Sequence, residues 1–188
     1  MKRFALAALL AIAITLTSGK AFAASVSVDL PFQFTFSNEF LDKQKQAKPK
    51  DRDATANGFI LTATGGLLGA AYEHYEVNGK GQSNNPFDIR MSFQFYDLLV
   101  DLPFPVANLA VGYGVGTINT QLSGTGAPTI GEADATQAFA RLGIPFGKLL
   151  DLHLGYHLIR TEGGKFAGTN DKFIPEGRTL TVGVRAGW

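Results

Sequence analysis

The 188-residue chain has no cysteine and a nearly balanced charge, with 17 basic against 16 acidic side chains. The absence of cysteine excludes a disulfide framework and thiolate chemistry. The near-neutral balance, without a basic stripe, argues against a nucleic-acid-binding protein.

Residues 1–23 have the features of a secretory signal peptide. Lys2 and Arg3 precede an apolar run of eleven residues that begins at Phe4, and small residues at Ala21 and Ala23 mark a cleavage site. The run is too short for a membrane anchor, which needs about 20 residues. We therefore expect one mature domain over 24–188, with 14 basic and 16 acidic side chains.

The first predicted strand, 25–36, has the clearest two-residue alternation in the chain. Its apolar face carries Val26, Val28, Leu30, Phe32, Phe34 and Phe36. Its other face carries Ser25, Ser27, Asp29, Pro31, Gln33 and Thr35. The following segment, 37–56, holds lysines between Lys43 and Lys50 and is predicted to be a solvated loop.

The next three predicted strands are 57–64, 67–77 and 87–97. Outward positions are expected at Phe59, Leu61 and Ala63, then at Leu68, Ala70 and Tyr72, then at Ile89, Met91, Phe93 and Phe95. Inward positions are expected at Gly69, Ala71 and Glu73 and at Arg90, Ser92, Gln94 and Tyr96. A polar loop is predicted at 78–86 and a turn at 98–106.

Four more strands are predicted at 107–121, 134–146, 150–161 and 179–188. The lipid-facing sets are Leu109, Val111, Tyr113, Val115; Ala138, Ala140, Leu142, Ile144, Phe146; Leu152, Leu154, Tyr156, Leu158; and Leu180, Val182, Val184, Ala186, Trp188. Loops are predicted at 122–133 and 162–176.

The eight strands and their alternating long and short connections predict an all-β fold, an eight-stranded antiparallel up-and-down transmembrane β-barrel. Both termini would lie on the periplasmic side and the four long loops outside the cell. The alternative is a soluble β-barrel or sandwich. It is disfavoured because the polar faces are mostly Gly, Ser, Thr and Gln, which suit a narrow interior better than a solvated exterior.

A polar network is expected inside the barrel. Arg141 lies near mid-strand, where a lipid-facing arginine costs about 2–4 kcal/mol, and so should face inward. The predicted interior network is Asp29, Gln33, Glu73, Arg90, Gln94, Gln137, Arg141, His153, His157 and Arg185. A plugged interior is favoured over a polar pore, because eight strands leave little room.

No catalytic, cofactor or metal site is predicted. His153 and His157 share one strand face but lie about 13 Å apart by strand rise, too far for one metal ion. A pairing of His157 with Glu73 or Glu162 is conceivable for hydrolysis, but no motif links these residues. The lysines between Lys43 and Lys50 could contact lipopolysaccharide phosphates, although such a run is more often a solvated loop.

The signal at Met1–Ala23, the alternating strands and the closing segment Thr179–Trp188 together resemble the small eight-stranded outer-membrane proteins of Gram-negative bacteria, of the OmpA membrane-domain, OmpX and OmpW type. The resemblance implies location in the cell outer membrane. It also implies that Leu180, Val182, Val184 and Trp188 form a signal for the barrel-assembly machinery, with Trp188 where phenylalanine is more usual.

Two functions from different classes remain open at this stage, since fold does not imply function. The favoured one is a non-enzymatic barrel, expected to be a monomer, that contacts outer-membrane lipid and lipopolysaccharide. Its loops would serve envelope integrity, adhesion or small-ligand contact. The alternatives are a lipid A deacylase-like or acyltransferase-like enzyme, or a narrow conduit for small apolar molecules.

Overall fold

The computed structural model describes residues 24–37, 52–81, 87–104, 106–124, 130–147, 149–161, 164–165, 172–173 and 176–187. The predicted signal peptide and Trp188 lie outside these residues. The described part contains no helix that is long and apolar enough to cross a membrane.

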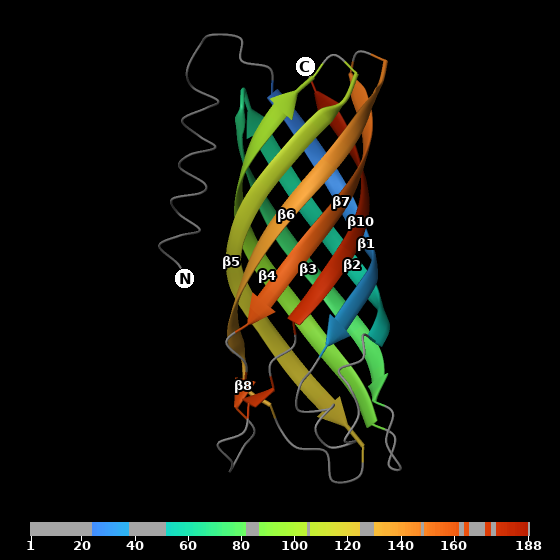
Figure 1. Ribbon diagram of the computed structural model, residues 1–188, viewed down its shortest axis with the longest axis vertical. Coiled ribbons are helices and arrows are strands. Elements are labelled where there is room, and N and C mark those ends of the chain that lie inside the picture. Colours follow the sequence, from blue (N-terminus) through green and yellow to red (C-terminus); the bar gives the residue numbers. More distant parts are fainter. Residues whose placement is uncertain are drawn as a thin grey trace.

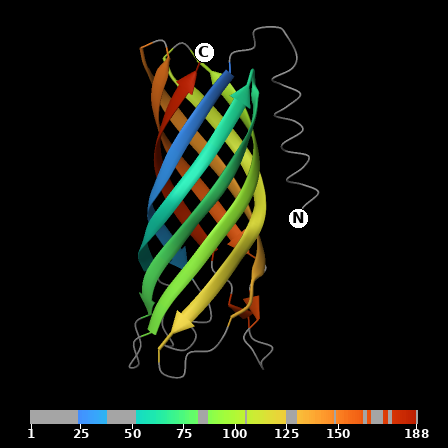
Figure 2. The same cartoon turned by 180° about the vertical axis from the view of Figure 1, so that it is seen from behind.

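Eight strands close into one antiparallel barrel (Figures 1 and 2). They are β1 (Ala24–Ser37), β2 (Arg52–Gly65), β3 (Leu68–Gly81), β4 (Phe87–Pro103), β5 (Asn108–Ser123), β6 (Ala133–Phe146), β7 (Leu150–Thr161) and β10 (Glu176–Gly187). Strands next to each other in sequence pair throughout, and β10 pairs with β1 to close the barrel. The predicted fold class is confirmed.

A separate pair of short strands, β8 (Gly164–Lys165) and β9 (Lys172–Phe173), lies between β7 and β10 in sequence. Both fall inside the segment 162–176 that was predicted to be a loop. The chain therefore has a small hairpin where no strand was expected.

Three predicted connections are clearly shorter than expected. One is the loop 78–86, because β3 continues to Gly81. β2 begins at Arg52, which pairs with Phe36, so the predicted loop 37–56 extends too far. β4 continues to Pro103, which pairs with Asn108, so the predicted turn at 98–106 is also too long. Proline is compatible with this position because it stands at the end of a strand.

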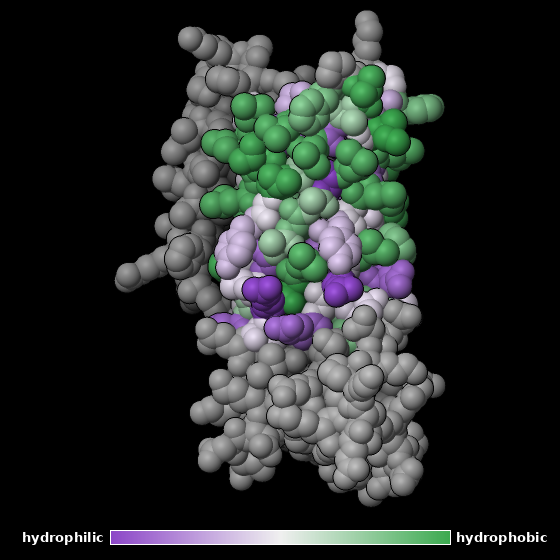
Figure 3. Space-filling view, viewed as in Figure 1, coloured by the Kyte–Doolittle hydropathy of each residue, from purple (hydrophilic) through white to green (hydrophobic). Residues whose placement is uncertain are grey.

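We call the half of the barrel that holds Ala24 and Gly187 the termini half, and the opposite half the loop half. In the termini half the outward side chains are apolar, and Figure 3 shows them as a green region above a more polar one. On β7 this belt runs from Leu150 to Leu158. That is about 26 Å of strand, or about 20 Å of membrane thickness at a tilt of roughly 40°, close to the usual band of about 25 Å.

The belt confirms the predicted outward positions of β5, β6, β7 and β10 as far as they are described. Exposed members include Val111, Tyr113, Val115, Leu142, Ile144, Phe146, Leu152, Leu154, Tyr156, Leu158, Val182 and Val184. Only a closed barrel can carry such a surface in lipid, because lipid offers no partner to an unpaired strand edge.

The loop half has the opposite arrangement, with apolar side chains inside and polar ones outside. Its interior core contains Phe34, Phe36, Tyr75, Val77, Ile89, Met91, Phe93, Phe95, Ile118 and Ile159. Phe93 lies at its centre, with its ring centroid 4.9 Å from that of Tyr75 and 5.1 Å from that of Phe34.

The predicted facing of the fourth strand was therefore wrong. Ile89, Met91, Phe93 and Phe95 face inward, and Arg90, Ser92, Gln94 and Tyr96 face outward. The prediction assumed that the apolar alternate faces lipid along the whole strand. β4 extends beyond the belt, and there the exterior is polar.

The predicted facing of Phe34 and Phe36 was wrong for a different reason. The pairing of β1 with β10 shifts by one residue between Pro31 and Gln33, and that shift reverses which alternate side chains face inward. Ser27 and Asp29 face inward before the shift, and Phe34 and Phe36 face inward after it. Pro31 has no N–H to donate to either neighbouring strand, which suits it to this irregularity.

Candidate functional site

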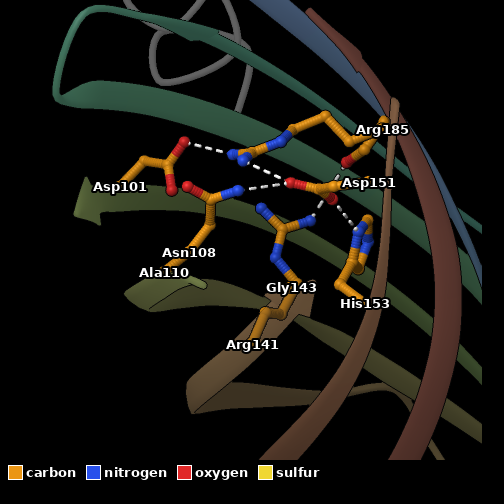
Figure 4. A pocket seen from close by; sticks show the side chains of 9 residues that line it. Asp101, Asn108, Ala110, Arg141, Gly143, Asp151, His153 and Arg185 are labelled. Carbon is orange, nitrogen blue, oxygen red and sulfur yellow. Dashed lines mark hydrogen bonds and ion pairs between the residues drawn. The ribbon is translucent and has the colours of Figure 1, made fainter. Parts of the chain in front are cut away.

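The polar interior of the termini half is the candidate functional site (Figure 4). Its members lie on inward alternate positions of all eight barrel strands. They form two groups along the barrel. The termini tier comprises Ser27, Asp29, Thr62, Asp101, Asn108, Arg141, Asp151, His153 and Arg185. The middle tier comprises Glu73, Asp97, Gln137, His157, Thr179 and Thr181.

His153 bridges two carboxylates at the centre of the termini tier. Its Nε2 atom lies 2.5 Å from Oδ1 of Asp29, and its Nδ1 atom lies 3.3 Å from Oδ1 of Asp151. Both ring nitrogens of His153 thus lie within hydrogen-bonding distance of a carboxylate oxygen.

Arg141 binds the other side of Asp29. Its Nη1 atom donates to Oδ2 of Asp29 at 3.1 Å, to Oγ1 of Thr62 at 2.9 Å and to Oγ of Ser27 at 3.2 Å. The guanidinium also lies 5.8 Å from the ring centroid of Phe139. Asp29 thus has a guanidinium and an imidazole as partners in a fully buried position.

Arg185 completes the tier near the termini. It forms ion pairs with Asp101 and Asp151, and Asn108 donates from Nδ2 to Oδ2 of Asp151 at 2.7 Å. Figure 4 shows these side chains converging from several strands. Three carboxylates therefore face two guanidiniums and one imidazole, so the group can be neutral overall, which limits the cost of burying its charges.

Glycines make room for this network. A Cβ atom at Gly183 would lie 2.5 Å from Nε2 of His153 and 2.6 Å from Oδ1 of Asp29. Gly183 is on β10, between the strands that carry those two residues. A residue without a side chain is therefore needed at Gly183 for Asp29 and His153 to meet across β10.

The middle tier is less completely hydrogen-bonded. His157 Nδ1 lies 3.2 Å from Oε1 of Glu73, and its ring stacks on that of Phe139 at 5.0 Å. Gln137 donates from Nε2 to Oδ1 of Asp97 at 2.6 Å. Among the described residues, both oxygens of Glu73 and both ring nitrogens of His157 have no hydrogen bond of good geometry.

The arrangement offers little chemistry. Within the described ranges, no group of three or more histidine or acidic side chains is placed to hold a metal ion. Both ring nitrogens of His153 contact carboxylates, so neither is left to activate Ser27 as a nucleophile. The cavity lined by the termini tier has a volume of about 10 Å³, room for about one water molecule.

The structure brings together seven of the ten residues named for the interior network. Asp29, Arg141, His153 and Arg185 lie in the termini tier, and Glu73, Gln137 and His157 lie in the middle tier. Their pairing was not predicted in detail, but their common inward facing was.

The other three residues do not join the network. Arg90 is exposed and lies 3.7 Å from Glu76 on the outer wall. Gln94 also faces outward and donates to the hydroxyl of Tyr96 at 2.9 Å. Gln33 pairs with Leu180 after the shift in β1 and so occupies an outward register. All three belong to the loop half, where the interior is apolar.

Several members of the network were missed by sequence reasoning. Ser27 and Asp151 stand two residues before Asp29 and His153, on the same inward alternate, so the pattern could have identified them. Asp101 and Asn108 flank the turn that was predicted too long, and Asp97 ended the shortened fourth strand. Asp97 was missed because its alternate on β4 was predicted to face outward, and Asp101 because it fell inside the predicted turn. Asn108 was not singled out, although it lay in the predicted strand 107–121.

The sequence matches no protein-family model and no curated protein. Solved structures that share the fold include the following two. Neisserial surface protein A superposes with a TM-score of 0.62 at 11% identity, over 90% of this chain and 98% of that one. Ail, the attachment invasion locus protein of Yersinia pestis, crystallised with the heparin analogue sucrose octasulfate, superposes with a TM-score of 0.52 at 10% identity, over 90% of this chain and all of that one.

The closed antiparallel barrel, its exposed apolar belt and its polar interior agree with these likenesses in fold. A belt of this kind is stable only in hydrocarbon, and even-stranded antiparallel barrels of this construction are found in bacterial outer membranes. The chain is therefore an eight-stranded β-barrel of the cell outer membrane, similar in fold to the two surface proteins.

Proposed function

We propose that the protein is a non-enzymatic surface barrel with a plugged interior, whose loop half stands outside the cell. The termini half anchors it in the membrane. The loop half and the loops beyond it serve adhesion, envelope integrity or contact with small ligands.

One observation carries this proposal: side chains fill the barrel interior at every level that is described. The two polar tiers occupy the termini half, and the apolar core closes the loop half. A water-filled channel would have to cross the packed rings of Phe34, Phe93 and Phe95. The same packing argues against a conduit for small apolar molecules through the lumen.

The outer wall of the loop half supports a role in contact. The described strands extend past the belt there, furthest on β3, β4 and β5, and present polar side chains such as His74, Ser92, Asn119 and Gln121. Ail, which has a similar fold, is an attachment protein crystallised with a heparin analogue. That likeness favours adhesion among the contact roles.

Labelling of single cysteines tests the orientation, because the natural chain has no cysteine of its own. Asn119→Cys places a thiol on the exposed wall of the loop half, and Val106→Cys places one in an exposed turn of the termini half. A membrane-impermeant maleimide should label Asn119→Cys on intact cells and Val106→Cys only after permeabilisation. The reverse pattern would overturn the proposal.

Two further measurements separate the alternatives. Purified protein in a planar bilayer should produce no stepwise ion current, and regular current steps would establish an open pore. The mass spectrum of lipid A should be the same in cells with and without the protein. A change in acyl-chain number that depends on the protein would establish a lipid-modifying enzyme instead.

A further inference from the structure

We propose that Arg160 on β7 and Arg178 on β10 form a binding site on the outer wall for the phosphate groups of an outer-leaflet lipid, with lipopolysaccharide as the partner. The inference rests on the proposed function in one respect, that the loop half faces the outer leaflet. It names a place on the barrel for that contact.

The two arginines lie close together on the outer wall. Arg178 pairs with Leu158, and Arg160 is the next outward residue of β7 towards the loops. Both line an open groove of about 190 Å³, together with Thr35, Leu158 and Glu176. The groove thus presents two guanidinium groups on neighbouring strands.

Neither guanidinium has a hydrogen bond or an ion pair with any described residue. This sets the pair apart from Arg90, Arg141 and Arg185. Arg141 and Arg185 form ion pairs with buried aspartates. Arg90 lies beside Glu76 and donates from Nε to Oδ1 of Asn78 at 3.4 Å. Arg160 and Arg178 therefore have their donors available for a ligand.

The position of the pair selects the chemistry of that ligand. Leu158, which is 46% exposed, lies directly beside Arg178. Tyr156 continues the apolar belt from there towards the termini. A molecule bound here meets hydrocarbon-compatible surface on one side and two cations on the other. That combination fits an amphiphile with acyl chains and an anionic headgroup.

Phosphate suits the headgroup better than a single carboxylate. A guanidinium offers a planar fork of donors that matches two phosphate oxygens. Glu176 lies in the same groove and lowers its net positive charge. Two arginines against one glutamate still favour an anion, and a doubly charged phosphate gains most from the pair.

Native mass spectrometry of the folded mature chain in detergent tests the site by titration with purified lipid A that carries two phosphates. The double variant Arg160→Gln/Arg178→Gln should bind this lipid about tenfold more weakly or worse, as expected when charge-assisted hydrogen bonds are lost. Arg90→Gln is the matched control, since it removes an exposed arginine of the loop half elsewhere on the wall, and its affinity should stay within about twofold. Folding of each variant is checked by circular dichroism.

Three comparisons decide the outcome. Wild-type protein should bind dephosphorylated lipid A about as weakly as the double variant binds intact lipid A, and equal binding of both lipids would overturn a phosphate site. An equal loss in Arg90→Gln would reduce the effect to general charge and also overturn it. Inorganic phosphate should not compete at matched ionic strength. Full competition would assign the pair to a soluble anion and not to a lipid.

The titration is independent of membrane orientation, because it is done in detergent. Reversed cysteine labelling together with selective lipid A binding would refute the proposed function and leave the phosphate site in place. Correct labelling with unchanged binding in the double variant would refute only the site.

Discussion

The termini half and the loop half of this barrel are built from the same eight strands but distribute their side chains in opposite ways. In the termini half, leucines and valines face outward and aspartates, arginines and histidines face inward. In the loop half, phenylalanines and isoleucines face inward, while Arg90, Asn119 and Gln121 face outward. The difference shows that the solvent around the wall, and not the strand itself, decides whether the apolar side chains face outward or inward. Where the wall meets hydrocarbon the interior holds charge, and where it meets water the interior is an ordinary hydrophobic core.

The termini half depends on paired buried charges, so its largest expected loss comes from breaking them. Asp29→Ala removes the carboxylate shared by His153 and Arg141 and leaves the buried guanidinium and imidazole without it. We expect a loss of about 3–5 kcal/mol in the free energy of unfolding, measured by urea titration in detergent. Stability within about 1 kcal/mol of wild type would mean that the network contributes nothing to the fold.

The loop half depends on packing, and a cavity there should cost nearly as much. Phe93→Ala removes the ring that contacts Tyr75, Phe34 and Phe95. The expected cost is about 3–5 kcal/mol by the same urea titration. Asn119→Ala on the outer wall of the same half is the control and should stay within about 0.5 kcal/mol. Similar values for the two variants would contradict an apolar core in the loop half.

The same new charge should have different effects on the two outer walls. Leu154→Arg places a cation in the middle of the apolar belt, where the cost is about 2–4 kcal/mol. Ser92→Arg places it on the outer wall of the loop half, where a surface substitution changes stability by about 0.5 kcal/mol or less. The measured quantity is the free energy of folding of each variant into lipid vesicles. Equal costs at both positions would show that the belt extends over the whole barrel.

The smallest effect is expected at the exposed ion pair of the loop half. Arg90→Gln breaks a contact of 3.7 Å to Glu76 between side chains that are 60% and 44% exposed. Water screens such a pair, so the loss should be about 0–1 kcal/mol and should diminish further in high salt. A loss comparable with that of Asp29→Ala would mean that Arg90 lies in an environment like that of the termini tier.

The sequence predicted the barrel class, the strand number and most of the belt. On β6 and β7 the predicted facing is correct throughout the described residues, because the apolar alternate of these strands, Ala138–Phe146 and Leu150–Leu158, lies against the membrane for most of their length. The predicted facing was wrong on β4, where Phe93 and Phe95 have the same sequence pattern as residues of the apolar belt. An apolar alternate has the same period whether it faces lipid or a core. Nothing local to β4 distinguishes the two.

The polar site was predicted in the same partial way. Arg141 was placed inside because a lipid-facing arginine near mid-strand is costly, and His153 because it lies on the polar alternate of its strand. Gln33 and Gln94 also lie on the polar alternates of their strands, but they face outward. The assembly signal at Leu180, Val182, Val184 and Trp188 stays a prediction, as do the signal peptide and the monomeric state. Val182 and Val184 face outward, and Trp188 lies outside the described residues.

The sequence by itself determined that this chain forms alternating strands that close into a barrel, because a two-residue period and turn spacing are local properties. Only the tertiary structure decided where along each strand the membrane ends, which aspartate meets which cation, and that Phe34 and Phe36 turn inward after Pro31. These depend on strand register and on the solvent outside the wall at each level. Neither quantity is a property of one strand alone.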